Sequence, residues 1–230
     1  MLKVFCARST HVAVTTLVGR SQAGGPDIVF EPMGALQARL AAGETGDVLI
    51  LTAPAIEALA TSGELQPDTR AVIARAPIGV AIREGTPAPN IATPDAFKEA
   101  ITAARAIALS DPAVGGSAGT YLRELFGRMG VAEIVAAKTV HVKSGVAAAE
   151  AVGRGEADLA MTFIPELLQG VGVRILGPLP PPYDHSTTYA AAVSVRSNCP
   201  DAARAFIAVL TAPDAASVWV AAGFAVGSHE

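Results

Sequence analysis

The feature that most constrains the fold is an alternation of short apolar runs with helical segments. Apolar runs at residues 2–6, 28–30 and 47–51 contain Val, Ile and Phe, which predicts short buried strands. Helical signals follow each run, at 11–20, from 34 to 43, and at 53–60. A strand that is followed by a helix and another strand favours a parallel sheet with helices on both faces. The predicted fold class is therefore α/β.

A second block of the same kind occupies the middle of the chain. Its clearest element is a helix over 117–129, in which Leu122, Leu125, Phe126 and Met129 recur at helical spacing. The remaining predicted strands cover 77–83, 106–110, 135–142, 159–163 and 187–196, and the remaining helices cover 94–104, 146–152, 201–210 and 214–222. The strand over 135–142 carries the weakest pattern of the set.

Two Pro-rich stretches, 84–90 and 177–182, bracket this second block. They suggest two lobes that are joined by two chain crossings. Lobe 1 would contain residues 1–82 plus 187–230, and lobe 2 residues 83–186. A cleft between two lobes is the default place for a small ligand. One continuous sheet is the alternative arrangement.

Composition excludes several classes of protein. Of 230 residues, 51% are hydrophobic and 47 are Ala, so the chain can bury enough surface to fold. The net charge of -4 without basic clusters argues against a nucleic-acid partner. No apolar run reaches the roughly 18 to 20 residues that span a bilayer, so no membrane segment is expected.

The first residues resemble a secretory signal only weakly. Lys3 and Arg8 precede an apolar run at 12–18, but Arg20 lies directly before the small residues of a supposed cleavage site at 21–23. We therefore expect a cytoplasmic protein, with a periplasmic location as the alternative.

Metal and cofactor motifs are missing from the sequence. Cys6 and Cys199 are far apart, and no CxxC or HxxxH spacing occurs. The four histidines are scattered along the chain: His11, His141, His185 and His229. We expect two reduced thiols, no metal and no cofactor.

Small or hydroxyl residues recur where a predicted strand turns into a helix. Four turns share this pattern: Ser9-Thr10, Gly34-Ala35, the Gly- and Ser-rich segment 115–119, and Ser144-Gly145. Free N–H groups and the positive end of a helix suit an anion, although helix capping explains any single turn. Arg8 and Lys143 are the nearby cations, so neutral dipoles would hold the anion.

Segment 115–119 also matches GxSxG, the nucleophile elbow of serine hydrolases, and Asp158 and His185 follow in a permitted order. The elbow requires its serine directly after a strand, whereas residues 111–114 separate Ser117 from the predicted strand. An anion-binding turn is therefore favoured over a hydrolase.

At these turns the sequence resembles the molybdate-binding proteins of ABC transporters, which have the type 2 periplasmic-binding-protein fold. The resemblance covers nearly the whole chain and is carried by residues 4–9, 33–36, 47–50, 110–112, 118–121, 155–158, 205–207 and 213–216. It implies a two-lobed α/β fold with a hinge of two crossings. It also implies a small anion held by hydroxyls and backbone N–H groups of both lobes.

The resemblance implies a set of ligand-binding residues. Met33 stands where the family usually has a serine, and Phe163 where it often has a tyrosine, so two hydroxyl donors are lost. Missing donors argue against molybdate itself. The implied ligand-binding set, together with the turns above, is Arg8, Ser9, Thr10, Met33, Gly34, Ser110, Ser117, Gly119, Thr120, Ser144, Gly145 and Phe163.

Residues 78–83 and 177–180 are similar to a branch of this family that includes bacterial aconitate isomerase. The branch implies a carboxylate ligand. Isomerisation of aconitate is an allylic proton shift, which needs a base. Arg8 would grip a carboxylate, and His11 or Glu31 would move the proton, with Tyr121 as a further catalytic candidate. The ordinary alternatives are a surface or capping role for His11 and core packing for Tyr121.

The expected function is binding of a small organic anion in the cleft between the lobes. Two alternatives stay open: a cytoplasmic isomerase of an unsaturated polycarboxylic acid, and a molybdate or oxyanion receptor. The receptor would have an ABC transporter as partner only if the protein is exported. A homodimer contact on the Ala-rich surface also stays open.

Overall fold

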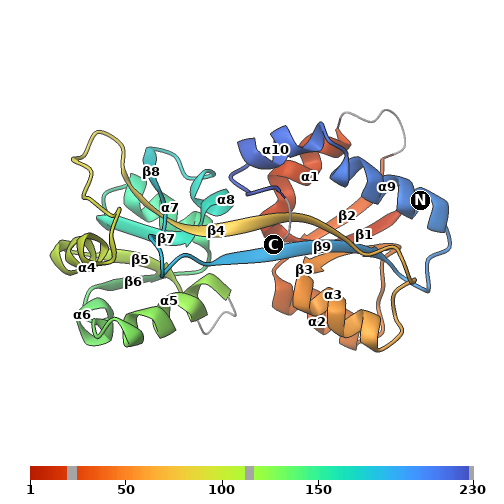
Figure 1. Ribbon diagram of the computed structural model, residues 1–230, viewed down its shortest axis with the longest axis horizontal. Helices are drawn as coiled ribbons and strands as arrows, with labels where there is room; N and C mark the ends of the chain where they lie inside the picture. The colour runs from red at the N-terminus through yellow and green to blue at the C-terminus, as the bar shows by residue number, and fades with distance from the viewer. Residues whose placement is uncertain (20–24, 112–116, 228–230) are drawn as a thin grey trace. The chain divides into compact units, whose positions relative to one another are not determined.

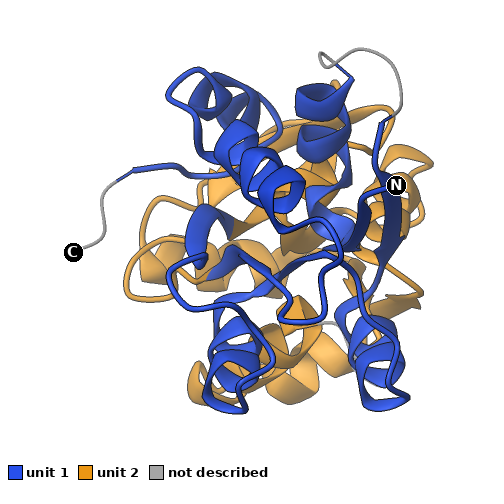
Figure 2. Ribbon diagram, turned by 90° about the vertical axis from the view of Figure 1, so that its right-hand side faces the viewer, with its two compact units in different colours: residues 1–76, 187–230 blue, residues 77–186 orange. Residues whose placement is uncertain are grey.

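The computed structural model describes residues 1–19, 25–111 and 117–227. The cleavage-like residues 21–23, Gly115 and Gly116 of the GxSxG segment, and His229 lie outside the described residues. The contacts of the chain divide it into two compact units, which Figure 2 colours separately: unit 1 is residues 1–76 with 187–230, and unit 2 is residues 77–186.

Unit 1 contains a four-stranded mixed sheet. Its strands lie in the order β2-β1-β3-β9, with β1 parallel to both β2 and β3, and β9 antiparallel to β3. The strands are β1 (Lys3–Ala7), β2 (Asp27–Glu31), β3 (Val48–Thr52) and β9 (Ser186–Val193). The helices are η1 (Arg8–Thr10), α1 (His11–Val18), α2 (Met33–Ala41), α3 (Ala53–Thr61), α9 (Pro200–Thr211) and α10 (Ala215–Ala221). Figure 1 shows α1, α9 and α10 on one face of this sheet and α2 and α3 on the other.

Unit 2 repeats the alternation of strands and helices. Its strand order is β4-β7-β5-β6, with β8 also paired to β4. β5 runs parallel to β6 and β7, whereas β4 is antiparallel to β7 and β8. The strands are β4 (Ala71–Arg83), β5 (Ile107–Ser110), β6 (Thr139–Val142), β7 (Leu159–Phe163) and β8 (Val173–Pro178). The helices are α4 (Pro94–Ala103), α5 (Ser117–Arg128), α6 (Ala132–Ala136), α7 (Gly145–Gly153) and α8 (Ile164–Leu167).

The α/β class and the hinge of two crossings are confirmed, because β4 and β9 each contain one boundary between the units. These two strands are also neighbours in the hydrogen-bonded strand order. The strands therefore form one continuous hydrogen-bonded order, and the chain also divides into two compact units. The two arrangements that the sequence left open are both present.

Three details of the predicted elements are wrong. The sheets are mixed and not purely parallel, because β4 and β9 pair antiparallel with their neighbours. Residues 135–142 do not form one strand: Val135 is buried in helix α6, and β6 begins only at Thr139. Burial of a β-branched side chain in a helix outweighs its local preference for a strand. β8 was not predicted, since it ends on the Gly177-Pro178 pair that indicates a loop.

Alanine forms much of the core of unit 2. A cluster of fully or almost fully buried residues joins α7 to β5 and β7, and its alanines are Ala81, Ala108, Ala148, Ala149, Ala151, Ala157 and Ala160. Small side chains allow a helix to lie close to a sheet, and close packing maximises dispersion contacts. The high alanine content therefore has a structural explanation in the packing of α7.

Within the described part of the chain, no single helix has the length and hydropathy to span a membrane. Only α9 and α10 taken together pass that test, and they are bent by 63° at the break between them. Their apolar residues Phe206, Leu210 and Trp219 are buried. Both helices therefore contribute apolar side chains to the core of unit 1.

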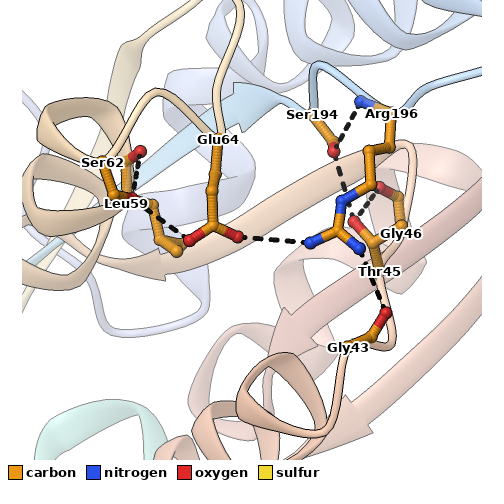
Figure 3. A network of polar contacts seen from close by, with 8 residues as sticks. All are labelled: Gly43, Thr45, Gly46, Leu59, Ser62, Glu64, Ser194 and Arg196. Atoms are coloured by element: carbon orange, nitrogen blue, oxygen red, sulfur yellow. Dashed lines mark hydrogen bonds and ion pairs between the residues drawn. The ribbon is translucent and has the colours of Figure 1, made fainter.

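A polar network fixes the loops at the edge of unit 1 where β3 begins (Figure 3). The Arg196 guanidinium donates to Gly43 O at 3.1 Å and contacts Glu64 Oε2 at 3.4 Å, and the Arg196 N–H donates to Ser194 Oγ. Ser62 Oγ holds the other oxygen of the same Glu64 carboxylate. The loops after α2, α3 and β9 are thereby joined at the edge opposite the carboxyl ends of β1 and β2.

Candidate functional site

In unit 1 the first two predicted turns lie side by side. β1 and β2 are parallel and in register, with Ala7 opposite Glu31, so both strands end at the same edge of the sheet. Residues Arg8–Thr10 follow β1 as a short 3-10 helix, and Met33 begins α2 after Pro32. The fold of this unit thus brings Arg8, Ser9 and Glu31 to one edge.

Ser9 is buried in this turn and makes a long-range contact. Its Oγ donates a 2.7 Å hydrogen bond to the phenol oxygen of Tyr189, which is buried on β9. Thr10 is also buried, and its hydroxyl donates to Ala7 O at 2.8 Å. The Ser9 hydroxyl is therefore bound to the hydroxyl of another side chain, and a hydroxyl can act as donor or acceptor. The Thr10 hydroxyl is bound to the backbone of its own turn.

Glu31 forms a bidentate ion pair that the sequence did not suggest. Arg39, in the last turn of α2, donates from Nε and Nη2 to the two Glu31 oxygens at 2.9 and 2.8 Å. These hydrogen bonds lower the pKa of Glu31, and the nearby charge of Arg8 lowers it further. A carboxylate that is stabilised in this way is a weaker proton acceptor. The environment of Glu31 therefore favours a role as the ion-pair partner of Arg39 over a role as a catalytic base.

Of the other predicted residues of unit 1, three are exposed and one is half-buried. His11 is exposed, and its ring meets the ring of Phe30 edge-on at 4.6 Å. Gly34 is exposed on α2, where an added Cβ would touch nothing within 4 Å. Met33 is half-buried against the core between α2 and β1. Arg8 is exposed, and its guanidinium makes no hydrogen bond to the part of the chain that the structure describes.

In unit 2 the remaining turns also share one edge. β5 and β6 are parallel and end together, with Ser110 opposite Val142, and β7 is parallel to β5. The Ser144 hydroxyl caps α7 by accepting from the N–H of Ala147 at 3.2 Å. Gly119 packs the first turn of α5 against Ser110, because an added Cβ would lie 2.6 Å from Ser110 O. Helix capping accounts for Ser144, and the close approach to Ser110 accounts for Gly119, so neither residue requires a ligand as its explanation.

Sequence reasoning missed a carboxylate at the start of α7. Thr162, fully buried at the end of β7, donates from Oγ1 to Glu166 Oε2 at 2.6 Å. Both side-chain oxygens lie against Gly145, the first residue of α7, and an added Cβ there would collide with both. The carboxylate thus lies at the positive end of α7, where the anion was expected. The only sequence signal is the spacing of Thr162 and Glu166, which is too common to be diagnostic.

The other predicted residues of unit 2 lie near this edge or in the core. Phe163 is buried beside Thr162 and pairs with Ile78 on β4. Ser117 is exposed at the start of α5, and Thr120 is half-buried in its first turn. Their role in ligand binding stays a prediction.

Tyr121 belongs to an aromatic cluster. Its hydroxyl donates to Tyr183 O at 2.9 Å, and its ring stacks on His185 with a centroid distance of 4.1 Å. The Arg128 guanidinium lies over the same ring. Burial, followed by the charge of Arg128, lowers the pKa of His185. Tyr121 thus has a packing role in unit 2, and a catalytic role for it stays a prediction.

The serine-hydrolase alternative finds no geometric support in the described residues. Asp158 accepts three hydrogen bonds from Arg105, the shortest at 2.6 Å, and His185 stacks on Tyr121. No described contact joins Ser117 to either residue, so a triad is not assembled.

Cation ligands and reactive thiols are also missing from the described ranges. No group of three or more His, Cys, Asp or Glu side chains that could hold a metal ion occurs among residues 1–19, 25–111 and 117–227. Cys6 and Cys199 are free thiols, and burial raises the pKa of Cys6 to about 12. The side chains at the two edges therefore offer hydroxyls, carboxylates, guanidinium groups and the imidazole of His11.

Comparisons with known proteins agree with this fold. A family model described as bacterial extracellular solute-binding protein matches residues 2–225. An aconitate isomerase from Pseudomonas sp is 36% identical over 183 residues, which cover 79% of this chain and 68% of the relative.

Solved structures show the same fold at lower identity. The substrate-binding domain of a molybdenum ABC transporter from Clostridium difficile, itself described as putative, has a TM-score of 0.81 and 16% identity, with 99% of each chain covered. The periplasmic molybdate-binding protein of Azotobacter vinelandii has a TM-score of 0.76 and 20% identity, with 99% of this chain and 100% of that chain covered. The chain therefore belongs to the bacterial extracellular solute-binding protein family and is a solute-binding-protein-like domain.

Proposed function

We propose that this protein binds a small organic carboxylate at its strand-to-helix turns, and that it does not bind a tetrahedral oxyanion such as molybdate. The observation that carries the proposal is the Glu166 carboxylate at the start of α7, against Gly145 and hydrogen-bonded by Thr162. A turn that already holds a carboxylate repels a second full negative charge.

Unit 1 supplies the groups that favour a carboxylate. Arg8 is exposed beside the buried hydroxyl of Ser9, and its guanidinium can bind a carboxylate in bidentate fashion. Arg39 is not available for this task, because both Glu31 and Glu44 accept hydrogen bonds from it. Arg8 and Ser9 are therefore the proposed anchors of the ligand carboxylate.

The α7 turn of unit 2 favours a different kind of ligand group. A ligand group beside Glu166 must donate a hydrogen bond, as a hydroxyl or a protonated carboxyl group does. Met33 and Phe163 have no hydroxyl, where the family that the sequence resembles usually has a serine and often a tyrosine. Two hydrogen-bond donors for an oxyanion are therefore missing, which also argues against molybdate. The resulting substrate class is an unsaturated or hydroxylated organic acid, and the relative named aconitate isomerase acts on a molecule of this class.

A thermal-stability screen tests the proposal. The protein is heated with molybdate, sulfate, phosphate, citrate, cis-aconitate or trans-aconitate in turn. A ligand at 100 times its dissociation constant adds about 2.7 kcal/mol of stability. We expect stabilisation by an organic acid and none by molybdate. Arg8→Ala and Ser9→Ala should each weaken the effect, whereas Thr15→Ala, at an exposed position of α1, should leave it unchanged. Stabilisation by molybdate alone contradicts the proposal.

The second candidate function is isomerisation of such an acid. The observation that favours it is again Glu166, a half-buried carboxylate that accepts a hydrogen bond from Thr162. In an allylic shift one base removes a proton from the carbon next to a carboxylate, the double bond moves, and the proton returns at the far carbon. Proton NMR of cis- and trans-aconitate with the protein tests this function. Interconversion that Glu166→Gln abolishes supports it, and a rate equal to that of buffer leaves binding alone.

Location and partner follow from the function. An isomerase would act in the cytoplasm, whereas a receptor would act outside it with an ABC transporter, in keeping with the extracellular description of the family. Cell fractionation of the source bacterium with an antibody distinguishes the two. We propose the cytoplasmic location for the isomerase function, and recovery of isomerase activity in the periplasmic fraction would overturn it.

A further inference from the structure

Unit 2 contains a second concave site, remote from its strand-to-helix turns. A cavity of about 320 Å³ lies where β5 and β7 begin, and the turns lie where these strands end. It is lined by the end of β4, the Pro-rich loop after it, the end of α4 and the chain before β7. Its apolar walls are formed by Ile82, Pro87, Pro89, Ala100, Ala103 and Leu159.

Arg83 gives this cavity an uncompensated positive charge. It lines the cavity, and its guanidinium makes no hydrogen bond or ion pair with any residue of the described ranges. Arg83 is exposed, and its guanidinium lies beside Gly155, with Nη1 3.2 Å from the position that a Cβ would take there. Gly155 follows the end of α7 and has φ +79°, a backbone conformation that glycine adopts without strain.

The other two charged residues of the cavity neutralise one another. Arg105 donates to Asp158 from its backbone N–H, from Nε and from Nη2, at 2.7, 3.2 and 2.6 Å. The lining therefore contains two arginines and one aspartate, and it carries a net charge of +1 in a chain whose net charge is -4.

We propose that this cavity binds a small monocarboxylate with an apolar hydrocarbon part. The carboxylate would pair with the Arg83 guanidinium, and the hydrocarbon would pack on Pro87, Pro89 and the alanines of α4. The volume is at the lower end of the roughly 300 to 1,000 Å³ of known ligand pockets, which limits the ligand to a small molecule. One free guanidinium matches one negative charge. The site is independent of Ser9, Glu166 and the function proposed for them.

Titration of the isotopically labelled full chain with phenylacetate, followed by amide NMR, tests the site. The expected result is saturable shifts at Arg83, Ala103 and Gly155. Benzylamine, which has a similar ring and a positive charge, should produce none. Arg83→Gln should weaken phenylacetate binding about tenfold, the usual effect of losing a charged hydrogen bond. Ala103→Phe should also weaken it, because the new ring fills the cavity and leaves Arg83 in place.

Two controls separate the site from charge in general and from the other proposed site. Arg123→Gln removes the same charge from an exposed position of unit 2 and should leave phenylacetate binding unchanged. Ser9→Ala should also leave it unchanged. The proposal is overturned if phenylacetate produces no saturable shifts, or if Arg83→Gln binds it as tightly as the unsubstituted protein.

Discussion

The hydroxyl of Ser9 donates a 2.7 Å hydrogen bond to the phenol oxygen of Tyr189, across 180 residues of sequence. Ser9 follows β1, and Tyr189 lies on β9, the strand through which the chain returns to unit 1. Both side chains are buried, so the bond ties the first turn of the chain to its last strand. The Ser9 hydroxyl keeps its acceptor capacity beside this bond, because a hydroxyl both donates and accepts.

Tyr189→Phe should lower the free energy of unfolding by about 1 kcal/mol, the usual net value of one buried hydrogen bond. Ser9→Ala should have a similar effect. Because both substitutions remove the same bond, the double variant should be less destabilised than the sum of the two, with a coupling energy of about 1 kcal/mol. Urea unfolding of the four proteins measures this coupling. Strict additivity would show that the bond adds nothing to stability.

The two glycines of α5 should respond oppositely to alanine. At Gly119 an added Cβ would lie 2.6 Å from the carbonyl oxygen of Ser110, and backbone cannot move aside cheaply. Gly119→Ala should therefore cost about 1 to 3 kcal/mol of stability. At Gly127 an added Cβ meets nothing within 4 Å, so Gly127→Ala should add about 0.5 to 1 kcal/mol. Thermal unfolding of both variants is the measurement, and equal effects would contradict the close approach at Ser110.

Glu166→Gln should increase the affinity of the protein for divalent oxyanions. The substitution removes the negative charge beside Gly145 while its amide oxygen can still accept from Thr162. We expect calorimetry to detect saturable sulfate or molybdate binding in this variant and none in the unsubstituted protein. Glu150→Gln, at an exposed position of α7, is the matched control and should have little effect. Equal gains in the two variants would assign the effect to net charge.

Asp158→Asn should lower stability more at neutral pH than in acid. Hydrogen bonds from Arg105 hold the pKa of Asp158 below its usual value. The stability gained from ionised Asp158 is therefore complete above the unfolded pKa of about 3.9, and it is lost as pH falls through the lower folded pKa. Because Arg105 is exposed, we expect a deficit of about 1 kcal/mol at pH 7 that is smaller at pH 2. Urea unfolding at both pH values measures it. Asp27→Asn, at an exposed residue of β2, should show no such change.

The fold could be predicted from the sequence because its signals are local. The apolar runs of β1, β3 and β7 and the helical spacing of Leu122, Leu125 and Phe126 each report on a few neighbouring residues. The error at Val135 arose where packing on neighbouring helices overruled a local preference.

The site could be predicted only in part. Parallel strands end at one edge, so the grouping of Ser9 with Glu31 and of Ser110 with Ser144 follows from the strand pattern. The partners of these groups come from distant segments that no spacing reveals. Tyr189 for Ser9 and Arg105 for Asp158 are contacts of this kind.

The negative charge at the turn before α7 could not be predicted from the sequence either. The sequence of this turn, Ser144-Gly145, is typical of an anion site, and only the three-dimensional contact places Glu166 there. A glycine that leaves room for a ligand and a glycine that leaves room for a neighbouring carboxylate look identical in sequence.

The most direct test of the central claim is calorimetric titration of the unsubstituted protein with trans-aconitate and, separately, with molybdate at the same ionic strength. We predict saturable binding of trans-aconitate that Arg8→Ala weakens about tenfold, and no heat of binding from molybdate. Saturable binding of molybdate together with no binding of trans-aconitate would contradict the proposed carboxylate specificity.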